Sequence, residues 1–377
     1  MTDTLAAITA ALAASAPRHD ADASFPHENF TLLHRHGLLA LAVGREFGGA
    51  GADLRRAREV IAAVARGEPA TALVLTMQFL QTRALSQPDC RWPAALRERV
   101  LRDAVRDGAL ANALRVEPEL GSPARGGLPA TTARRTPQGW RLSGHKLYST
   151  GSEGLAWLVV WARTEEAQPR VGHFLVPREA HGVQVLRTWD SLGLRASASH
   201  DVRFDDVLLP ADHAVDLRAP RDWIDAPDAP LQQAWMSVLL GTLYDAIAHN
   251  ARDWLVGFLR ERVPSNLGAP LATLPRAQEA VGEIEALLLA NRVQLDAASA
   301  AADANMPWPA VDSGLLKMSV TRRAIEVVER ALRLSSNHGL ARANPLERHH
   351  RDVLCGRVHT PQDDSACIAA GRAVLQA

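Results

Sequence analysis

The chain has 377 residues, and its 42 Lys and Arg balance its 42 Asp and Glu, so the formal net charge is zero. Nucleic acids and anionic membrane surfaces attract basic proteins, and this balance argues against either as the main partner. Hydrophobic residues make up 47% and charged residues 22%, which is typical of a globular protein of about two or three domains. The three cysteines, Cys90, Cys355 and Cys367, follow no metal-ligand spacing and predict a reduced, cytoplasmic protein without a metal site. No uncharged apolar run is long enough to span a bilayer.

The N-terminal part, residues 1–110, is predicted to form an α-helical domain. Apolar residues recur every three or four positions in residues 55–69 and 70–85, which is the period of a helix with one buried face. Residues 93–108 begin with a proline and end with a glycine, the usual order at the two ends of a helix. The Gly-rich segment "REFGGAG", residues 45–51, has no strand before it, so we interpret it as a loop between helices.

The middle part, residues 111–220, is predicted to be a β domain. Residues 131–150 contain two alternating runs around Pro137-Gln138-Gly139, which indicates a hairpin. Further short apolar runs, separated by Gly, Pro and Asp, predict strands in residues 155–164, 171–177, 182–189 and 200–210. Such spacing is typical of a small barrel or sandwich. The Pro-rich residues 219–230 are interpreted as a linker.

The C-terminal part, residues 221–377, returns to long helical patterns and is predicted to be an antiparallel helical bundle. The expected helices cover residues 231–261, 274–305, 311–337, 346–354 and 363–376. The predicted fold class is therefore α+β, with an N-terminal helical domain, a small β domain and a helical bundle in chain order.

Four sequence motifs indicate which protein family has this order of domains. They are "VEPELGS" (residues 116–122), "GHKLYSTGS" (144–152), "SLGLRASASHDVRFDDVLLP" (191–210) and "PLERHHRD" (345–352). Each is a weak signal alone, but together and in this order they resemble the acyl-CoA dehydrogenase superfamily of flavoproteins, over nearly the whole chain. The resemblance implies the acyl-CoA dehydrogenase fold and a bound FAD, with FMN as the alternative.

The resemblance also implies which residues contact the flavin. Gly121 and Ser122 would bind a phosphate, since a glycine turn offers backbone N–H groups and serine a hydroxyl. Thr150 would donate a hydrogen bond toward the flavin edge, and Tyr148 would lie beside the ring. Without the family, both would be interpreted as strand packing. Val116 departs from the pattern, because the family's Thr offers the flavin a hydroxyl at this position and valine has none.

Two further positions extend the predicted cofactor site. "ERVPSNLGAPL", residues 261–271, resembles a turn of the family in which an Arg reaches the flavin diphosphate of a neighbouring subunit. Carried over, this role falls on Arg262, whose fork suits phosphate oxygens; the alternative is a surface arginine at a helix end. The carry-over implies at least a dimer, and the family implies a homotetramer. Thr360 aligns with the Thr of the family's catalytic "YEGT" loop.

That loop, "RVHTPQDD" (residues 357–364), lacks the family's catalytic glutamate. The alignment places Val358 at the Glu position and His359 at the Gly. A minority of the family carries its Glu on the first long bundle helix, where this chain has Leu231, Gln232 and Gln233. The carboxylate that removes a proton next to a thioester is therefore absent from both known positions.

The loop and the "YSTG" strand look more similar to the superfamily's reduced-flavin monooxygenases, such as dibenzothiophene monooxygenase. In that branch a histidine beside the flavin stabilises or protonates the oxygenated cofactor, which makes His359 the candidate catalytic residue. The branch often has a second histidine on an early helix, and this chain has Gln78 there. The alternative interpretation is that His359 is a loop residue with only a structural role.

Three functions stay open on the sequence. The first is monooxygenation of a small organic substrate, with a separate flavin reductase as partner. The second is dehydrogenation of an acyl-CoA with a relocated base, His359, Asp363 or Asp364, and an electron-transfer flavoprotein as partner. The third is a non-catalytic flavin- or acyl-binding protein. In the bland interpretation, Asp363 and Asp364 cap the last helix, and His349 and His350 lie on a helix surface.

Overall fold

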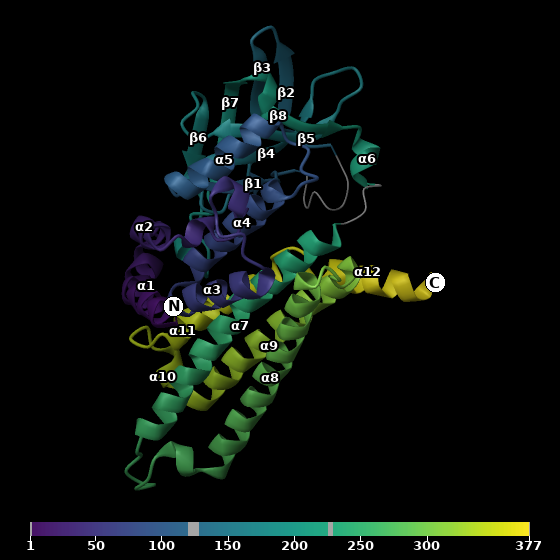
Figure 1. Ribbon diagram of the computed structural model, residues 1–377. Helices are drawn as coiled ribbons and strands as arrows, with labels where there is room; N and C mark the ends of the chain where they lie inside the picture. Colours follow the sequence, from purple (N-terminus) through teal and green to yellow (C-terminus); the bar gives the residue numbers. More distant parts are fainter. Residues whose placement is uncertain (1, 120–127, 225–228, 377) are drawn as a thin grey trace.

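The computed structural model describes residues 2–119, 128–224 and 229–376. An N-terminal group of helices lies between a β domain, at the top of Figure 1, and a long helical bundle below it. The N-terminal helices are α1 (Thr2–Asp22), α2 (His27–Arg35), α3 (Leu54–Gly67), α4 (Pro69–Ser86) and α5 (Ala94–Arg106). Residues 45–51 form a loop with one short 3-10 turn between α2 and α3, as predicted.

Side-chain caps fix the start of the two helices at the centre of this group. The carboxylate of Asp53 accepts a hydrogen bond from Arg56 N at the start of α3, and that of Glu68 accepts from Ala70 N and Thr71 N at the start of α4. Both caps satisfy N–H groups that a helix leaves unpaired at its first turn. Nearly all residues of α4 are buried, so α4 is the element on which the β domain and the bundle both pack.

All strands of the described residues belong to one sheet of eight. They are β1 (Leu110–Leu114), β2 (Thr132–Thr136), β3 (Gly139–Lys146), β4 (Leu155–Thr164), β5 (Val171–Pro177), β6 (Val183–Leu186), β7 (Asp201–Leu209) and β8 (Ala214–Arg218). The strand order is β6-β7-β3-β2-β4-β5-β8, and β1 pairs with β4 in parallel. The predicted β2–β3 hairpin is confirmed, with Thr136 opposite Gly139. The sheet branches because one edge of β4 pairs with β1 along most of its length and with β2 at its end.

Long helices make up the C-terminal part, as predicted. They are α7 (Pro230–Glu261), α8 (Pro275–Asp303) and α9 (Ala310–Ser335), followed by α10 (Asn337–Leu340), α11 (Leu346–Leu354) and α12 (Asp363–Leu375). The expected linker over residues 219–230 was partly wrong, because Pro220–Ile224 form the short helix α6. No described helix is both long and apolar enough to cross a membrane.

The "PLERHHRD" helix α11 ties the three parts of the chain together. Arg351 forms an ion pair with Asp20 of α1 (2.6 Å), and its Nη1 donates to the carbonyl of Leu192. Asp352 accepts a hydrogen bond from Leu194 N (2.7 Å). Gly193 fits beneath α11 only without a side chain, since a Cβ there would lie 2.3 Å from Arg351 O. The motif therefore fixes the position of the loop that precedes β7.

His349 was expected on the helix surface, and this was wrong. It is buried, because α11 packs against α7 and α9 with the face that carries Leu346, His349 and Val353. Burial and the charge of Arg348 lower the pKa of His349 to about 3. His350, one residue further round the helix, is partly exposed as expected.

The buried carboxyl group of Asp352 gives a test of pH-dependent stability. Burial raises its pKa from 3.8 to about 7, against the opposing effect of the Leu194 N–H group. The stability it contributes is therefore fully present below its unfolded pKa and is lost as pH rises through about 7. Asn stays neutral and keeps an acceptor for Leu194, so Asp352→Asn should gain stability over the native chain as pH rises, up to about 4 kcal/mol.

Thermal unfolding of the native chain and Asp352→Asn between pH 4 and 8 measures this difference. The advantage of the variant should be near zero at pH 4 and largest at pH 8. Asp352→Ala is the control, because it removes the acceptor and should be less stable than Asp352→Asn throughout. Lower stability of Asp352→Asn than of the native chain at pH 8 would contradict the prediction.

Candidate functional site

The segment that connects β3 to β4 carries the two predicted ring contacts, Tyr148 and Thr150. Tyr148 is 62% exposed and has a positive φ of 52°, and its ring meets that of Trp189 edge to face at 6.3 Å. A non-glycine residue in this conformation costs energy, so the surroundings must hold it there. Three backbone hydrogen bonds do so by joining this segment to the 3-10 turn and loop just before β7, among them Ser149 N to His200 O (3.0 Å) and Gly151 N to Ser197 O (2.8 Å).

Thr150 lies in a short chain of hydroxyl groups. Its Oγ1 is 3.0 Å from Ser199 Oγ, which is 2.8 Å from Ser197 Oγ. Asn112 of β1 donates to the carbonyl of Thr150 at 3.0 Å. The motifs did not predict a role for Ser199 or Asn112. The Ser-Ala-Ser run within residues 191–210 could have indicated the serine, but nothing in the sequence indicates Asn112.

These residues fit the ring of a flavin. Such a ring needs hydrogen-bonding groups along its edge and apolar contact on its faces. Thr150, whose hydroxyl contacts that of Ser199, comes two residues after Tyr148, whose exposed ring contacts Trp189. Val116 contributes its carbonyl to this segment, since it accepts a hydrogen bond from Leu147 N (3.0 Å). Gly121 and Ser122, the expected phosphate contacts, lie outside the described residues.

A buried ion pair joins the first two motifs beneath this segment. Lys146 Nζ lies 2.6 Å from Glu117 Oε1, and both side chains are almost completely buried. Glu117 also accepts hydrogen bonds from Thr131 N (3.0 Å) and Thr131 Oγ1 (2.5 Å), and Lys146 donates to Trp161 O (2.5 Å). Burial alone would raise the pKa of Glu117, but hydrogen bonds from Lys146 and Thr131 hold it below its usual value. The pair positions the motifs and was not predicted from the sequence.

The second candidate group surrounds His359, in the loop after the 3-10 turn Cys355–Arg357. His359 Nδ1 forms a hydrogen bond with the hydroxyl of Tyr244, a buried residue of α7. Lys317 of α9 is fully buried, and its Nζ donates to the carbonyls of Gly356 and His359, each at 2.7 Å. The lysine therefore holds the loop at both ends of its turn, and Tyr244 fixes the imidazole.

Burial sets the protonation of this group. It lowers the pKa of His359 to about 4, helped by the charge of Lys317, and lowers the pKa of Lys317 to about 8. Burial also raises the pKa of Tyr244 well above its usual value. At neutral pH the phenol is un-ionised and the imidazole neutral. Either Tyr244 or Nδ1 can be the donor in this hydrogen bond; the tautomer in which the phenol donates to Nδ1 carries the imidazole proton on Nε2.

The carboxylates near the loop are not arranged as a base. Val358, at the family's glutamate position, is 67% exposed. Asp363 Oδ2 accepts a hydrogen bond from Arg322 Nε (2.8 Å). Asp363 and Asp364 are the first two residues of α12, and neither is its N-cap, which is Gln362. The expectation that they cap the helix was therefore wrong, although acidic residues in a first turn do favour a helix.

Gln232 of α7 and Gln78 of α4, which stand near the other positions considered for a catalytic residue, make structural hydrogen bonds. Gln232 hydrogen-bonds to Arg83 (3.1 Å). Gln78 is buried and links α4 to β1, since its side chain accepts from Ala111 N (2.7 Å) and donates to Ala109 O (3.2 Å). The residue that replaces the second histidine of the monooxygenase branch is thus structural. No described His, Cys, Asp or Glu residues form a group that could hold a metal ion.

The remaining predicted residues lie apart from these two groups. Thr360 follows His359 and is exposed. Arg262 is exposed at the end of α7, where the connection to α8 lies at the end of the bundle farthest from the sheet (Figure 1). Within one chain it therefore meets neither Thr150 nor His359.

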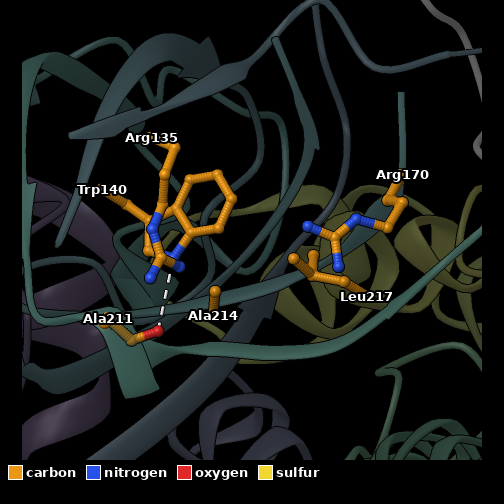
Figure 2. A pocket seen from close by; sticks show the side chains of 6 residues that line it. All are labelled: Arg135, Trp140, Arg170, Ala211, Ala214 and Leu217. Atoms are coloured by element: carbon orange, nitrogen blue, oxygen red, sulfur yellow. Dashed lines mark hydrogen bonds between the residues drawn. The ribbon is translucent and has the colours of Figure 1, made fainter. Parts of the chain in front are cut away.

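A pocket of about 300 Å³ lies elsewhere, on the β domain (Figure 2). Arg135 stacks on Trp140 there, and Arg170 is paired with Glu166. The pocket contains neither an acid nor a base and shares no residue with the Tyr148 or His359 groups, so it offers no chemistry. Its lining consists of Arg135, Trp140, Arg170, Ala211, Ala214 and Leu217.

Comparison with known proteins decides the family. Models of the N-terminal, middle and C-terminal domains of acyl-CoA dehydrogenase match residues 2–87, 115–207 and 245–363. The putative acyl-CoA dehydrogenase YdbM of Bacillus subtilis is 31% identical over 353 residues, which cover 93% of this chain and 90% of that protein. The chain belongs to the acyl-CoA dehydrogenase superfamily. The predicted family and fold class are thereby confirmed, and the protein is a flavin-dependent oxidoreductase.

Another relative of this superfamily member carries the name of a nitrososynthase. This chain is 30% identical to L-evernosamine nitrososynthase of a Micromonospora species, with 99% of this chain and 89% of that protein covered. The structure of KijD3 in complex with FMN and dTDP-3-amino-2,3,6-trideoxy-4-keto-3-methyl-D-glucose has a TM-score of 0.87 and 31% identity, and covers 99% of this chain and 92% of that one. The relatives of this chain thus include proteins named as acyl-CoA dehydrogenases and one named as a nitrososynthase.

Proposed function

We propose that the protein is a reduced-flavin monooxygenase that acts on a small organic substrate, with FMN as the flavin. The observation that carries the proposal is the His359 group: the catalytic loop has Val358 at the dehydrogenases' glutamate position and holds a fixed, neutral imidazole at the next residue. Two relatives at 30 and 31% identity, a nitrososynthase and the FMN-bound KijD3, support the same class. FAD is the alternative flavin, because it is the cofactor that the wider family implies.

In the proposed reaction one oxygen atom of dioxygen enters the substrate and the other leaves as water, and a reduced flavin supplies the two electrons. His359 holds a proton on Nε2, an atom that no described residue engages, and Tyr244 keeps the ring oriented through Nδ1. The charge of Lys317 disfavours the imidazolium, so the ring stays neutral. Its Nε2–H group would act as a fixed hydrogen-bond donor to the reacting oxygen, and the ring would neither gain nor lose a proton.

The flavin is proposed to lie along the segment that connects β3 to β4. Tyr148 would contact the ring, and Thr150 with Ser199 would bind its edge. Gly121, Ser122 and Thr360 keep their proposed roles as cofactor contacts. Arg262 of a neighbouring subunit would bind a flavin phosphate, which accounts for its exposure far from the other contacts and requires a homo-oligomer, a tetramer by analogy with the family. A separate reductase would supply the reduced flavin.

Dehydrogenation of an acyl-CoA is the second candidate, and the likeness to YdbM favours it. It would require a base other than the family's glutamate. Asp363 pairs with Arg322 through Oδ2, whereas its Oδ1 is buried without a hydrogen bond to the described residues. In that case electrons would pass to an electron-transfer flavoprotein. We rank this function second because a neutral imidazole with a pKa of about 4 is a weak base for a thioester α-proton.

Two measurements on one preparation separate the candidates. The first is anaerobic reduction of the bound flavin by a panel of acyl-CoA thioesters. The second is oxygen uptake after reduced FMN is supplied, with indole and amino-sugar nucleotides as test substrates and mass spectrometry to find products heavier by one oxygen atom. We expect no anaerobic reduction and at least one oxygenated product. Rapid anaerobic reduction by any acyl-CoA would refute the monooxygenase proposal.

A further inference from the structure

Arg83 of α4 is a buried cation that the proposed mechanism does not use. The residue is only 8% exposed. Its guanidinium lies over the ring of Trp235, 4.9 Å from the centroid, and its Nη1 donates one hydrogen bond to Gln232 Oε1 at 3.1 Å. Both partners belong to α7 and both are uncharged. No carboxylate among the described residues lies within ion-pair distance of Arg83; the exposed Asp89 acts on its charge only from farther away and opposes the effect of burial on its pKa.

The two lysines buried in the described chain have polar partners. Lys146 pairs with Glu117, and Lys317 binds two carbonyls. A guanidinium carries five N–H donors, and Arg83 uses one of them on the described residues. Burial lowers its pKa to about 10, so it is still charged at neutral pH. A buried charge without a paired counter-ion lowers the free energy of unfolding. Proteins keep such a charge where a bound ligand supplies the counter-ion.

The place of Arg83 points to the substrate. Gln232 belongs to the stretch Leu231–Gln233, which matches the helix segment where a minority of the family carries its catalytic base, so we infer that Arg83 lies near the expected reaction centre. The helix faces around it are incompletely covered: Met77 and Gln81 of α4 and Gln233 and Met236 of α7 stay partly exposed, whereas most residues of both helices near the contact are buried.

We propose that Arg83, with Gln232 beside it, binds an oxyanion of the substrate, either a carboxylate or a phosphoryl group. The guanidinium fork matches two oxygens of either group, and Trp235 holds the fork in its plane. The inference rests on the proposed function only in placing the substrate next to Gln232. It narrows the substrate class to small molecules that carry a negative charge.

Calorimetric titration of the flavin-loaded protein tests the site with four probes. These are dTDP, inorganic pyrophosphate, benzoate and uncharged thymidine. We expect the native chain to bind either the phosphoryl probes or benzoate, which identifies the oxyanion, and to bind thymidine more weakly than dTDP. Arg83→Gln should weaken binding of that anion by about 10- to 100-fold, and Arg83→Lys should fall between, because it keeps the charge and loses the fork.

The control is Arg99→Gln. Arg99 also stacks on a tryptophan, Trp157, at 5.0 Å, but it is exposed on α5, so its removal should leave anion affinity unchanged. A second readout is thermal stability with flavin bound. Arg83→Gln should match or exceed the native chain, since it removes an unmatched buried charge, whereas an arginine kept only for structure would leave a less stable variant.

Three outcomes would overturn the inference. They are equal anion affinity in Arg83→Gln and the native chain, no binding of any anion at 10 mM (about 100-fold above a typical substrate affinity), and a marked loss of stability in Arg83→Gln. These results are independent of the reaction. Anaerobic flavin reduction by an acyl-CoA would refute the monooxygenase and leave the oxyanion site standing, because anion affinity is measured without turnover.

Discussion

Replacement of His359 by Ala is expected to lower turnover by about 10²- to 10⁴-fold while flavin binding is retained. The imidazole is the group that the catalytic loop presents, and Tyr244 and Lys317 fix it without any described carboxylate in the arrangement. Flavin affinity should be unchanged, because the proposed ring contacts Tyr148 and Thr150 lie on the β domain. Turnover and flavin affinity measured on the same preparation check both parts.

Matched variants separate the imidazole from its surroundings. Asp363→Asn removes the exposed ion pair with Arg322 and should change turnover little, since such pairs contribute about 0–1 kcal/mol. Tyr244→Phe keeps the ring but frees Nδ1, so it should lower turnover less than His359→Ala does. Near-normal turnover of His359→Ala would refute its catalytic role. A larger loss in Asp363→Asn would return the proton to a carboxylate and favour the dehydrogenase.

Lys146→Met is expected to lower the free energy of unfolding by about 3–5 kcal/mol, the largest stability effect we predict. It leaves the carboxylate of Glu117 buried without its cation, and burial raises the pKa of that carboxyl group. The same change removes the donor to Trp161 O. Chemical denaturation at pH 7 measures the loss. The fold around Tyr148 should loosen as well, because Glu117 and Lys146 join the two motifs that flank it.

A double-mutant cycle shows how much of this loss belongs to the unpaired charge. Lys146→Met combined with Glu117→Leu removes both charges, so the double variant should be more stable than Lys146→Met alone. Glu117→Leu is the companion single variant of the cycle. Glu117→Gln is measured beside it, because it keeps an acceptor for Thr131. A double variant less stable than both single variants would mean that the polar network itself, and not the charge, holds the motifs.

The sequence by itself determined the elements and the family. Helical and alternating periods, with Pro at helix starts and Gly at turns, are local properties of the chain, and they predicted the β2–β3 hairpin and the long helices α7, α8 and α9 within a few residues. Four motifs in order determined the superfamily. The absence of a glutamate at Val358 and at Leu231–Gln233 is also visible in the sequence alone, and it directed attention to His359.

Only the tertiary structure decided which charged and polar residues are buried together. Lys317 meets the carbonyl of His359 from 42 positions away, and Asp352 meets Leu194 from 158 positions away, so no local period signals either contact. His349 was expected at the surface because histidine is polar; the packing of α11 on α7 and α9 buried it. In the sequence Arg83 looks like an ordinary helix residue; in the structure Trp235 and Gln232 of α7 cover it. Burial arises from long-range packing, and it is burial that sets the pKa of His359 and leaves Arg83 without a described counter-ion.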